Sequence, residues 1–140
     1  MSDWKLFALG SALFAGMTVV LAKVGVKHIP SNFATLIRTV VIIFFIFLIV
    51  GSRGEWRNPF CLEKISLFFL VLSGITTGLS WLCYFRALQL GPASLVSVID
   101  KFSLVFALLF SFLFLGEHLS LIQGLGVGMI LCGTLLVALK

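Results

Sequence analysis

One stretch of the sequence decides the fold. It reads FATLIRTVVIIFFIFLIV, from Phe33 to Val50, and its single charged residue is Arg38. A helix needs about 17 to 25 mostly apolar residues to cross the hydrocarbon core of a bilayer, and this stretch lies within that range. Four further runs of the same kind flank it: Leu6–Ala22, Ile65–Phe85, Ala93–Leu115 and Leu119–Leu139. The sequence therefore predicts an all-α integral membrane protein with about five transmembrane helices.

The composition supports this class. Of the 140 residues, 61% are hydrophobic and 11% are charged, whereas a soluble domain carries about 25% charged residues. This chain cannot cover a folded surface with polar groups, so lipid must cover it. The net charge of +5 does not indicate nucleic acid, because the basic residues are scattered singly between apolar runs, where they set membrane topology. We therefore expect no enzyme, no cofactor and no nucleic-acid partner.

The breaks between the apolar runs indicate where the helices end. Pro30 separates the first two runs, and either Ser31 or Asn32 is suited to cap the second helix. Gly91 and Pro92 mark the turn before the fourth helix, since proline favours the start of a helix. We expect a single domain over residues 1–140. Its helices are predicted at residues 4–26, 32–51, 65–86, 93–115 and 119–139.

Three charged residues lie inside the apolar runs. Ionisable side chains are costly in a bilayer, so their default interpretation is functional. Asp100 and Lys101 lie about two turns inside the fourth helix, and Arg38 lies about a turn and a half inside the second. Adjacent helical residues do not face each other, so Asp100 and Lys101 are not simply one ion pair. Arg38 is a candidate partner for Asp100, and all three are candidates for a polar translocation cavity.

Three more residues complete the set of translocation candidates. Lys23 lies at a helix end, where snorkelling of its ammonium to the lipid headgroups is an equally good interpretation. Trp81 and Tyr84 are candidate pocket walls, although these residue types also mark the membrane interface. The sequence shows no Ser/His/Asp or Cys/His constellation and no set of metal ligands. We therefore assign no catalytic residues and no metal site.

Two pairs of glycines are candidates for helix packing. Helices associate in lipid through small residues that allow close approach. Gly74 and Gly78 form such a pair in the third helix, where packing within the chain is the favoured interpretation. Gly124 and Gly128 form another in the fifth helix, which has one neighbour along the chain. A contact with another subunit is at least as good an interpretation for that pair.

Three segments in a fixed order resemble a known family. They are GLSWLCYFRALQLGPASLVSV from Gly78 to Val98, IDKFS from Ile99 to Ser103, and LGEH from Leu115 to His118, followed by a glycine-rich helix. Together they resemble the EamA-type half of the drug/metabolite transporter superfamily. Lys23 and Arg38 also fall where that repeat commonly has basic residues. The resemblance covers essentially the whole chain and is strongest from Gly78 onward.

The chain departs from this family in two respects. Most members carry two five-helix repeats in one polypeptide, whereas this sequence resembles the short branch with a single repeat. Members often have proline just before the Ile-Asp-Lys segment, where this chain has Ser97 and Val98, which leaves a proline-dependent kink at that point open. The resemblance implies a secondary transporter or exporter of small organic solutes.

Two rival functions belong to other classes. One is a non-transporting accessory subunit, or half of a heteromeric membrane carrier. The other is a four-helix small multidrug proton exchanger, but those proteins rely on an acidic residue in the first helix, and the run Leu6–Ala22 contains none. The sequence has no Gly-x-x-x-x-Gly-Lys-[Ser/Thr] loop for ATP. Transport would therefore use an ion gradient or a partner protein.

The basic residues outside the hydrocarbon core are balanced between the two sides. One side would carry Lys5, Arg53, Arg57 and Lys64, and the other Lys23, Lys27, Arg86 and Lys140. Orientation follows the difference in Lys and Arg between the sides, so this balance favours insertion in both orientations, although a weakly biased single topology would show it too. Because secondary transporters alternate access between inverted repeats, we expect an antiparallel homodimer, or pairing with a related inverted partner, in the bacterial inner membrane.

Overall fold

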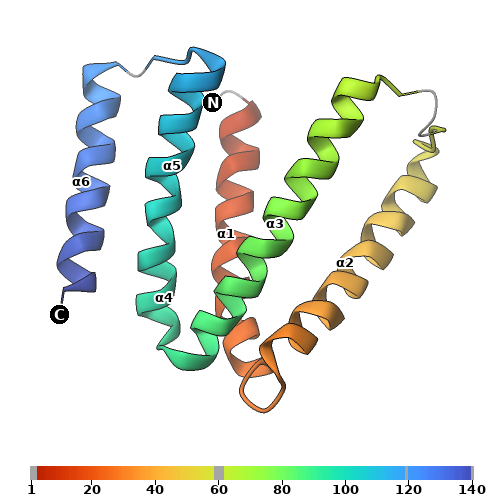
Figure 1. Cartoon of the computed structure of the whole chain (residues 1–140), viewed down its shortest axis with the longest axis horizontal. Helices are drawn as coiled ribbons and strands as arrows, with labels where there is room; N and C mark the ends of the chain where they lie inside the picture. The colour runs from red at the N-terminus through yellow and green to blue at the C-terminus, as the bar shows by residue number, and fades with distance from the viewer. Residues whose placement is uncertain (1–2, 59–61, 119, 140) are drawn as a thin grey trace. The chain divides into compact units, whose positions relative to one another are not determined.

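The chain is helical, as Figure 1 shows, and the computed structural model describes residues 3–58, 62–118 and 120–139. Over these residues, the structure has five helices that are long and apolar enough to cross a membrane. This confirms the predicted all-α class and the five predicted runs. The elements are α1 (Asp3–Gly25), α2 (Ser31–Arg53), α3 (Lys64–Leu90), α4 (Ala93–Ile99), η2 (Asp100–Phe102), α5 (Ser103–Phe110), η3 (Ser111–Leu115) and α6 (Leu121–Ala138).

The start of α2 corrects one expectation. Neither Ser31 nor Asn32 caps this helix, because Pro30 occupies the N-cap position with φ −53° and ψ 134°, and no side chain caps the helix. The carbonyl of Pro30 accepts the first helical hydrogen bond, from the amide of Ala34 at 2.9 Å. Ser31 is consequently already helical. The fixed φ of proline suits a position just outside the first turn, which explains why the boundary lies one residue earlier than expected.

Two other helix ends also differ from the predicted limits. Helix α3 continues past the predicted end at Arg86 to Leu90, just before the turn at Gly91 and Pro92. Within this last turn, Arg86 donates a hydrogen bond of 2.9 Å to the side-chain oxygen of Gln89. Helix α6 begins at Leu121 after a capping box, in which Ser120 and Gln123 bond to each other's backbone amides. The predicted first residue of this helix, Leu119, lies outside the described residues.

The fourth membrane span is one continuous run of four elements, from Ala93 to Leu115. It starts after Pro92, which is the N-cap as the Gly-Pro turn predicts. The helix tightens to 3₁₀ geometry over Asp100–Phe102 and widens to a π-helix over Ser111–Leu115. Irregular turns of this kind are often found at functional positions. The tightening occurs without a proline, directly after Ser97 and Val98.

The chain divides into two compact units, Val20–Leu90 and the pair of segments Met1–Val19 and Gly91–Lys140. In the unit Val20–Leu90, helices α2 and α3 run in opposite directions and pack side by side (Figure 1). Its buried side chains are Val26, Ser31, Thr35, Phe85 and Leu88. All of them lie at the end of the unit where the α1–α2 turn meets the last turns of α3.

In the other unit, α4 and η2 pack against α6. Thr134 is the buried residue of α6, and its hydroxyl donates to the carbonyl of Leu131 at 2.8 Å. A polar side chain that bonds its own helix in this way can lie in an apolar environment without an unpaired group. The packed side of α6 therefore holds the Thr134 hydroxyl without leaving it unpaired.

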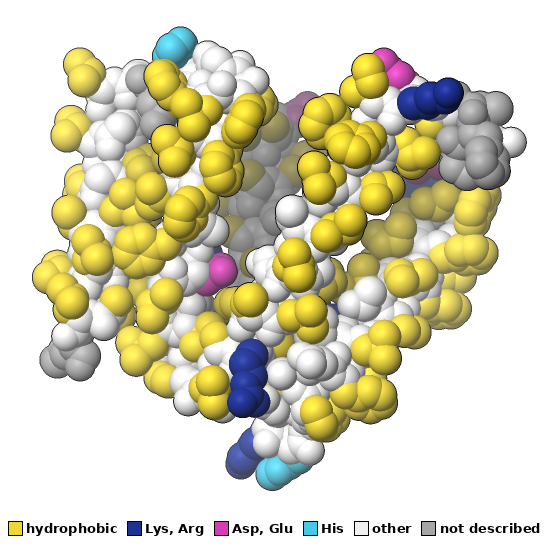
Figure 2. All heavy atoms as spheres, in the orientation of Figure 1, with side chains coloured by type: hydrophobic (Ala, Val, Ile, Leu, Met, Phe, Trp, Pro, Cys, Tyr) yellow, Lys and Arg dark blue, Asp and Glu magenta, His cyan; other side chains and the backbone are white. Residues whose placement is uncertain are grey.

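Most large apolar side chains point outward. Phe44 and Phe45 of α2 are 63% and 62% exposed, and Phe68 and Phe69 of α3 are 64% and 62% exposed. Hydrophobic side chains cover the visible sides of the helices in Figure 2. Exposure on this scale does not occur in a soluble monomer. It fits helices whose sides are covered by lipid or by other helices.

Candidate substrate site

Helix α2 carries one polar face toward α3. Ser31, Thr35 and Arg38 follow the spacing i, i+4, i+7, which places them on one side of the helix. The hydroxyl of Thr35 donates to the carbonyl of Ser31 at 2.9 Å, and that of Thr39 donates to Thr35 at 2.8 Å. These hydroxyls are thus satisfied within the helix. Arg38 is the charged member of this face, and its guanidinium is a donor with five N–H groups and no acceptor.

The guanidinium of Arg38 lies against two aromatic rings of α3. Its Cζ atom is 4.4 Å from the centroid of Trp81 and 5.4 Å from the centroid of Phe85. Both distances are within the range of about 6 Å over which a cation is attracted to an aromatic face. Tyr84, one turn further along the same helix than Trp81, interacts electrostatically with the guanidinium. The structure thus brings Arg38, Trp81 and Tyr84 together.

Sequence reasoning missed Phe85, which is 3% exposed and forms the second ring of this cluster. A usable signal existed in its spacing. Trp81, Phe85 and Leu88 follow the same i, i+4, i+7 pattern as the polar face of α2. Because α3 is apolar on all sides, however, phenylalanines elsewhere on the helix looked equivalent.

Lys23 joins the end of α1 to the end of α3. Its ammonium donates a hydrogen bond to the backbone carbonyl of Leu88. The last carbonyls of a helix have no partner within the helix, and a cation there also complements the helix dipole. This contact gives Lys23 a structural role in the unit Val20–Leu90. Its part in translocation stays a prediction.

Gln89 is a second connection at this end, and sequence reasoning did not select it. Its side-chain amide donates to the carbonyls of Ile29 at 2.8 Å and Val26 at 3.4 Å. Its own oxygen accepts a hydrogen bond of 2.9 Å from Arg86. Gln89 thereby fixes the turn between α1 and α2 to the last turn of α3. The sequence signal that could have identified Gln89 is its position as a polar residue in the last turn of a largely apolar helix.

Asp100 and Lys101 belong to the other unit. Both are exposed and lie in the 3₁₀ turn η2, which contacts α6. A charged pair in such a turn, inside a run apolar enough to span the bilayer, keeps its functional interpretation. The proposed pairing of Asp100 with Arg38 stays a prediction.

The four packing glycines face open space within their own units. A Cβ atom built on Gly74 or Gly78 would meet no other described side chain or neighbouring helix of that unit within 4 Å, and the same holds for Gly124 and Gly128. Close packing at these glycines therefore stays a prediction. For α6 it would require a surface from outside its own unit.

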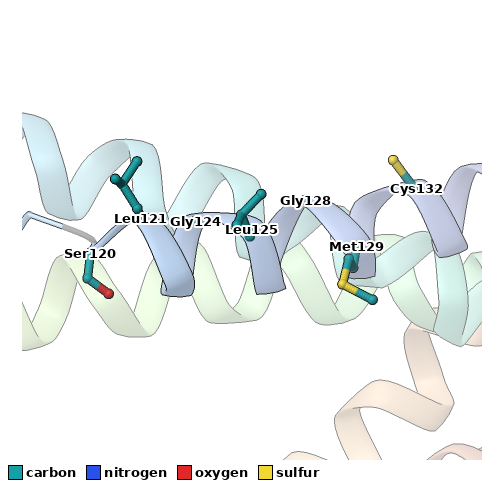
Figure 3. A pocket seen from close by; sticks show the side chains of 7 residues that line it. All are labelled: Ser120, Leu121, Gly124, Leu125, Gly128, Met129 and Cys132. Atoms are coloured by element: carbon teal, nitrogen blue, oxygen red, sulfur yellow. The ribbon is translucent and has the colours of Figure 1, made fainter.

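A shallow apolar groove of about 550 Å³ runs along α6. It is lined by Ser120, Leu121, Gly124, Leu125, Gly128, Met129 and Cys132. Figure 3 shows side chains projecting at the two leucines and at Met129, with none at the two labelled glycines between them. Those three side chains are 71% to 89% exposed. The groove has the form that a second helix would fill.

Among the described residues, the recorded ion pair joins Arg53 and Glu55 at 4.0 Å, and both side chains are exposed. No group of three or more His, Cys, Asp and Glu side chains in the same part of the chain could hold a metal ion. Three polar features of the spans bear on a substrate site. They are Arg38 with its aromatic neighbours, the Lys23 and Gln89 contacts, and the Asp100–Lys101 turn.

Five apolar spans with charged residues held inside them define a multi-pass membrane protein of the transporter class. The chain belongs to the EamA-like transporter family, which it matches over residues 3–139. It is 52% identical over 136 residues to a Sinorhizobium protein described as an uncharacterized transporter in the cobO 3′ region, covering 97% of this chain and 96% of that protein. No solved structure matches.

A second relative is much longer than this chain. Human solute carrier family 35 member G1 is 29% identical over 108 residues, which cover 76% of this chain and 29% of that protein. One relative is thus matched over nearly its whole length, and the other over less than a third. These findings confirm the family that the three motifs predicted. They also confirm that the chain belongs to a family of transporters and not to a family of enzymes.

Proposed function

We propose that this protein is a secondary transporter of small organic solutes that works as an antiparallel homodimer in the bacterial inner membrane. The observation that carries the transport proposal is Arg38. In a chain of the EamA-like family, this cation lies inside a membrane span against Trp81 and Phe85. A charge is retained at such a position when it serves a solute pathway.

Uptake into proteoliposomes tests the transport proposal. The purified protein is reconstituted with and without an imposed pH gradient and offered a panel of anionic, neutral and cationic organic solutes. We expect accumulation of at least one class above that of protein-free vesicles. If none of the classes enters under either condition, while the protein is folded and correctly inserted, the accessory-subunit alternative gains support instead.

The balance of basic residues supports insertion in both orientations. In the unit Val20–Leu90, α2 and α3 are antiparallel, so Arg53 and Lys64 lie at one end and Lys27 and Arg86 at the other. A near-equal number of cations at the two ends gives little preference for either direction. A reporter fused to the C-terminus should give both cytoplasmic and external signals from one gene. Two lysines added at the N-terminus should shift the population to one orientation and lower transport.

We place the contact between the two subunits on the groove of α6. The groove residues Gly124 and Gly128 leave room for the close approach of a second helix. Within one chain, a larger side chain at either glycine has open space. Gly128→Leu should therefore leave the subunit folded and weaken association, as measured by energy transfer between labelled chains in vesicles. Gly10→Leu on α1, another open position, is the matched control, and equal association of both variants would contradict this placement.

A further inference from the structure

We propose that Arg38 binds the anionic group of the transported solute, and that the substrate class is small organic carboxylates. This inference deepens the proposed function and rests on it. It follows from the position of the Arg38 guanidinium inside a span, its unused hydrogen-bond donors, and the absence of a carboxylate beside it among the described residues of its unit. Each of these observations is independent of the others.

Aromatic rings lie on the α3 side of the guanidinium. Its Cζ atom lies over the Trp81 ring at 4.4 Å, with Phe85 at 5.4 Å. The five N–H donors of an arginine point outward in the plane of the group. None of them hydrogen-bonds to the residues that the structure describes. A guanidinium with unused donors can bind a planar oxyanion through two parallel hydrogen bonds.

Arg38 also lies inside its span and not at the end of it. It is seven residues into α2, about 10 Å along the helix from Ser31. Its Cζ atom is closer to Trp81 than to Phe85, and Trp81 is one turn further from the end of α3. This position favours a solute in the interior over the phosphate of a lipid headgroup.

Within the unit Val20–Leu90, no carboxylate neutralises this cation. The acidic residues of the unit are Glu55 and Glu63, which lie beyond the opposite end of α2 and before α3, more than about 20 Å away along the helices. Glu55 is near Arg53 instead. A charge in this environment is costly without a partner. An incoming carboxylate would supply the missing negative charge, and the aromatic rings would contact its apolar part.

Binding of benzoate to the purified protein tests this inference. The protein is placed in nanodiscs of phosphatidylcholine, and radiolabelled benzoate is titrated with benzamide and benzylamine as competitors. We expect saturable binding that excess unlabelled benzoate displaces and that the neutral and cationic compounds do not. Arg38→Gln should weaken binding by at least about tenfold, because hydrogen bonds to charged groups are worth roughly 1.5 to 3 kcal/mol. Arg38→Lys, which keeps the charge but loses the fork, should fall in between.

The matched control is Arg53→Gln. Arg53 lies on the same helix and is exposed, so its loss should leave benzoate affinity unchanged. If Arg38→Gln and Arg53→Gln bind benzoate equally well while both remain monodisperse, the inference is overturned. It is also overturned if Arg38→Gln unfolds the protein and a second change, Asp100→Asn, restores it, because Arg38 would then serve an internal ion pair.

Three further outcomes distinguish a solute from a lipid headgroup as the source of the anion, and distinguish this inference from the transporter proposal. If phosphatidylglycerol in the nanodisc displaces benzoate from the wild-type protein, a lipid headgroup is the occupant and the carboxylate-solute inference fails. Transport of other solutes without Arg38-dependent benzoate binding would refute this inference and leave the transporter proposal standing. Arg38-dependent binding in a protein that transports nothing would leave the anion site standing and remove the transporter proposal.

Discussion

The packing of Leu88 yields a prediction whose size can be worked out. Leu88 is fully buried at 0% exposure, whereas Leu90, two residues later on the same helix, is 74% exposed. In water, Leu→Ala in a core costs about 2 to 5 kcal/mol. About 2.4 kcal/mol of that cost is the lost transfer free energy of three carbon atoms, at about 0.8 kcal/mol for each. A lipid tail is as apolar as leucine, so this transfer contribution is largely absent in a bilayer.

In a bilayer, the loss of packing contacts around the cavity that Leu88→Ala creates remains as a cost. We expect Leu88→Ala to destabilise the protein by about 1 to 2 kcal/mol, which corresponds to roughly a 5- to 30-fold change in the unfolding equilibrium constant. Leu90→Ala should change it by less than about 0.5 kcal/mol, because Leu90 faces outward. Unfolding would be followed by tryptophan fluorescence in mixed micelles with increasing denaturing detergent. Equal midpoints for the two variants would refute the assignment of the core of this unit to the end of α3.

Three other predictions follow. Gln89→Leu should destabilise the unit Val20–Leu90 by about 1 to 3 kcal/mol in the same unfolding assay, because two backbone carbonyls of the α1–α2 turn lose their donor; an unchanged midpoint would contradict this. Asp100→Asn and Lys101→Gln should each reduce solute uptake more than Arg57→Gln in the loop, at equal protein level, and equal small effects at all three positions would favour a packing or snorkelling role. A cysteine-free protein in vesicles would carry one introduced cysteine near each terminus, and an impermeant thiol label should react with only one of the two in each molecule. Molecules in which neither or both cysteines are labelled would rule out five spans.

The membrane spans could be predicted from the sequence because length and apolar composition alone determine them. Each run is long enough to cross the bilayer and is bounded by a turn signal, such as Pro30 or the pair Gly91 and Pro92. The exact ends of the helices were harder to predict from the sequence. Whether Pro30 or Ser31 takes the N-cap position depends on which carbonyl accepts the first helical bond. A charged residue such as Arg86 does not by itself end a helix, and α3 continues to Leu90.

The partners of the charged residues could not be predicted because the helices are apolar on all sides. In a soluble protein, the polar face of a helix identifies the opposite face as buried. Here lipid-facing and protein-facing positions carry the same residue types, so nothing in the pattern of α3 distinguishes Phe85 from Phe68. Arg38, Trp81 and Tyr84 were selected because their residue types are unusual in an apolar run. Their proximity required the register of α2 against α3.

The position of Arg38 relative to the packed end of its unit links stability to function. The buried residues Val26, Phe85 and Leu88 all lie at that end, and the hydrogen bonds from Lys23 and Gln89 join the same segments. Arg38 lies beside this packed end, against the rings of Trp81 and Phe85. A binding group held by rigid helices keeps its geometry better than one on a loop. The proposed anion site would therefore be formed by one chain, so variants that weaken subunit association at the α6 groove should lower transport while leaving benzoate affinity intact.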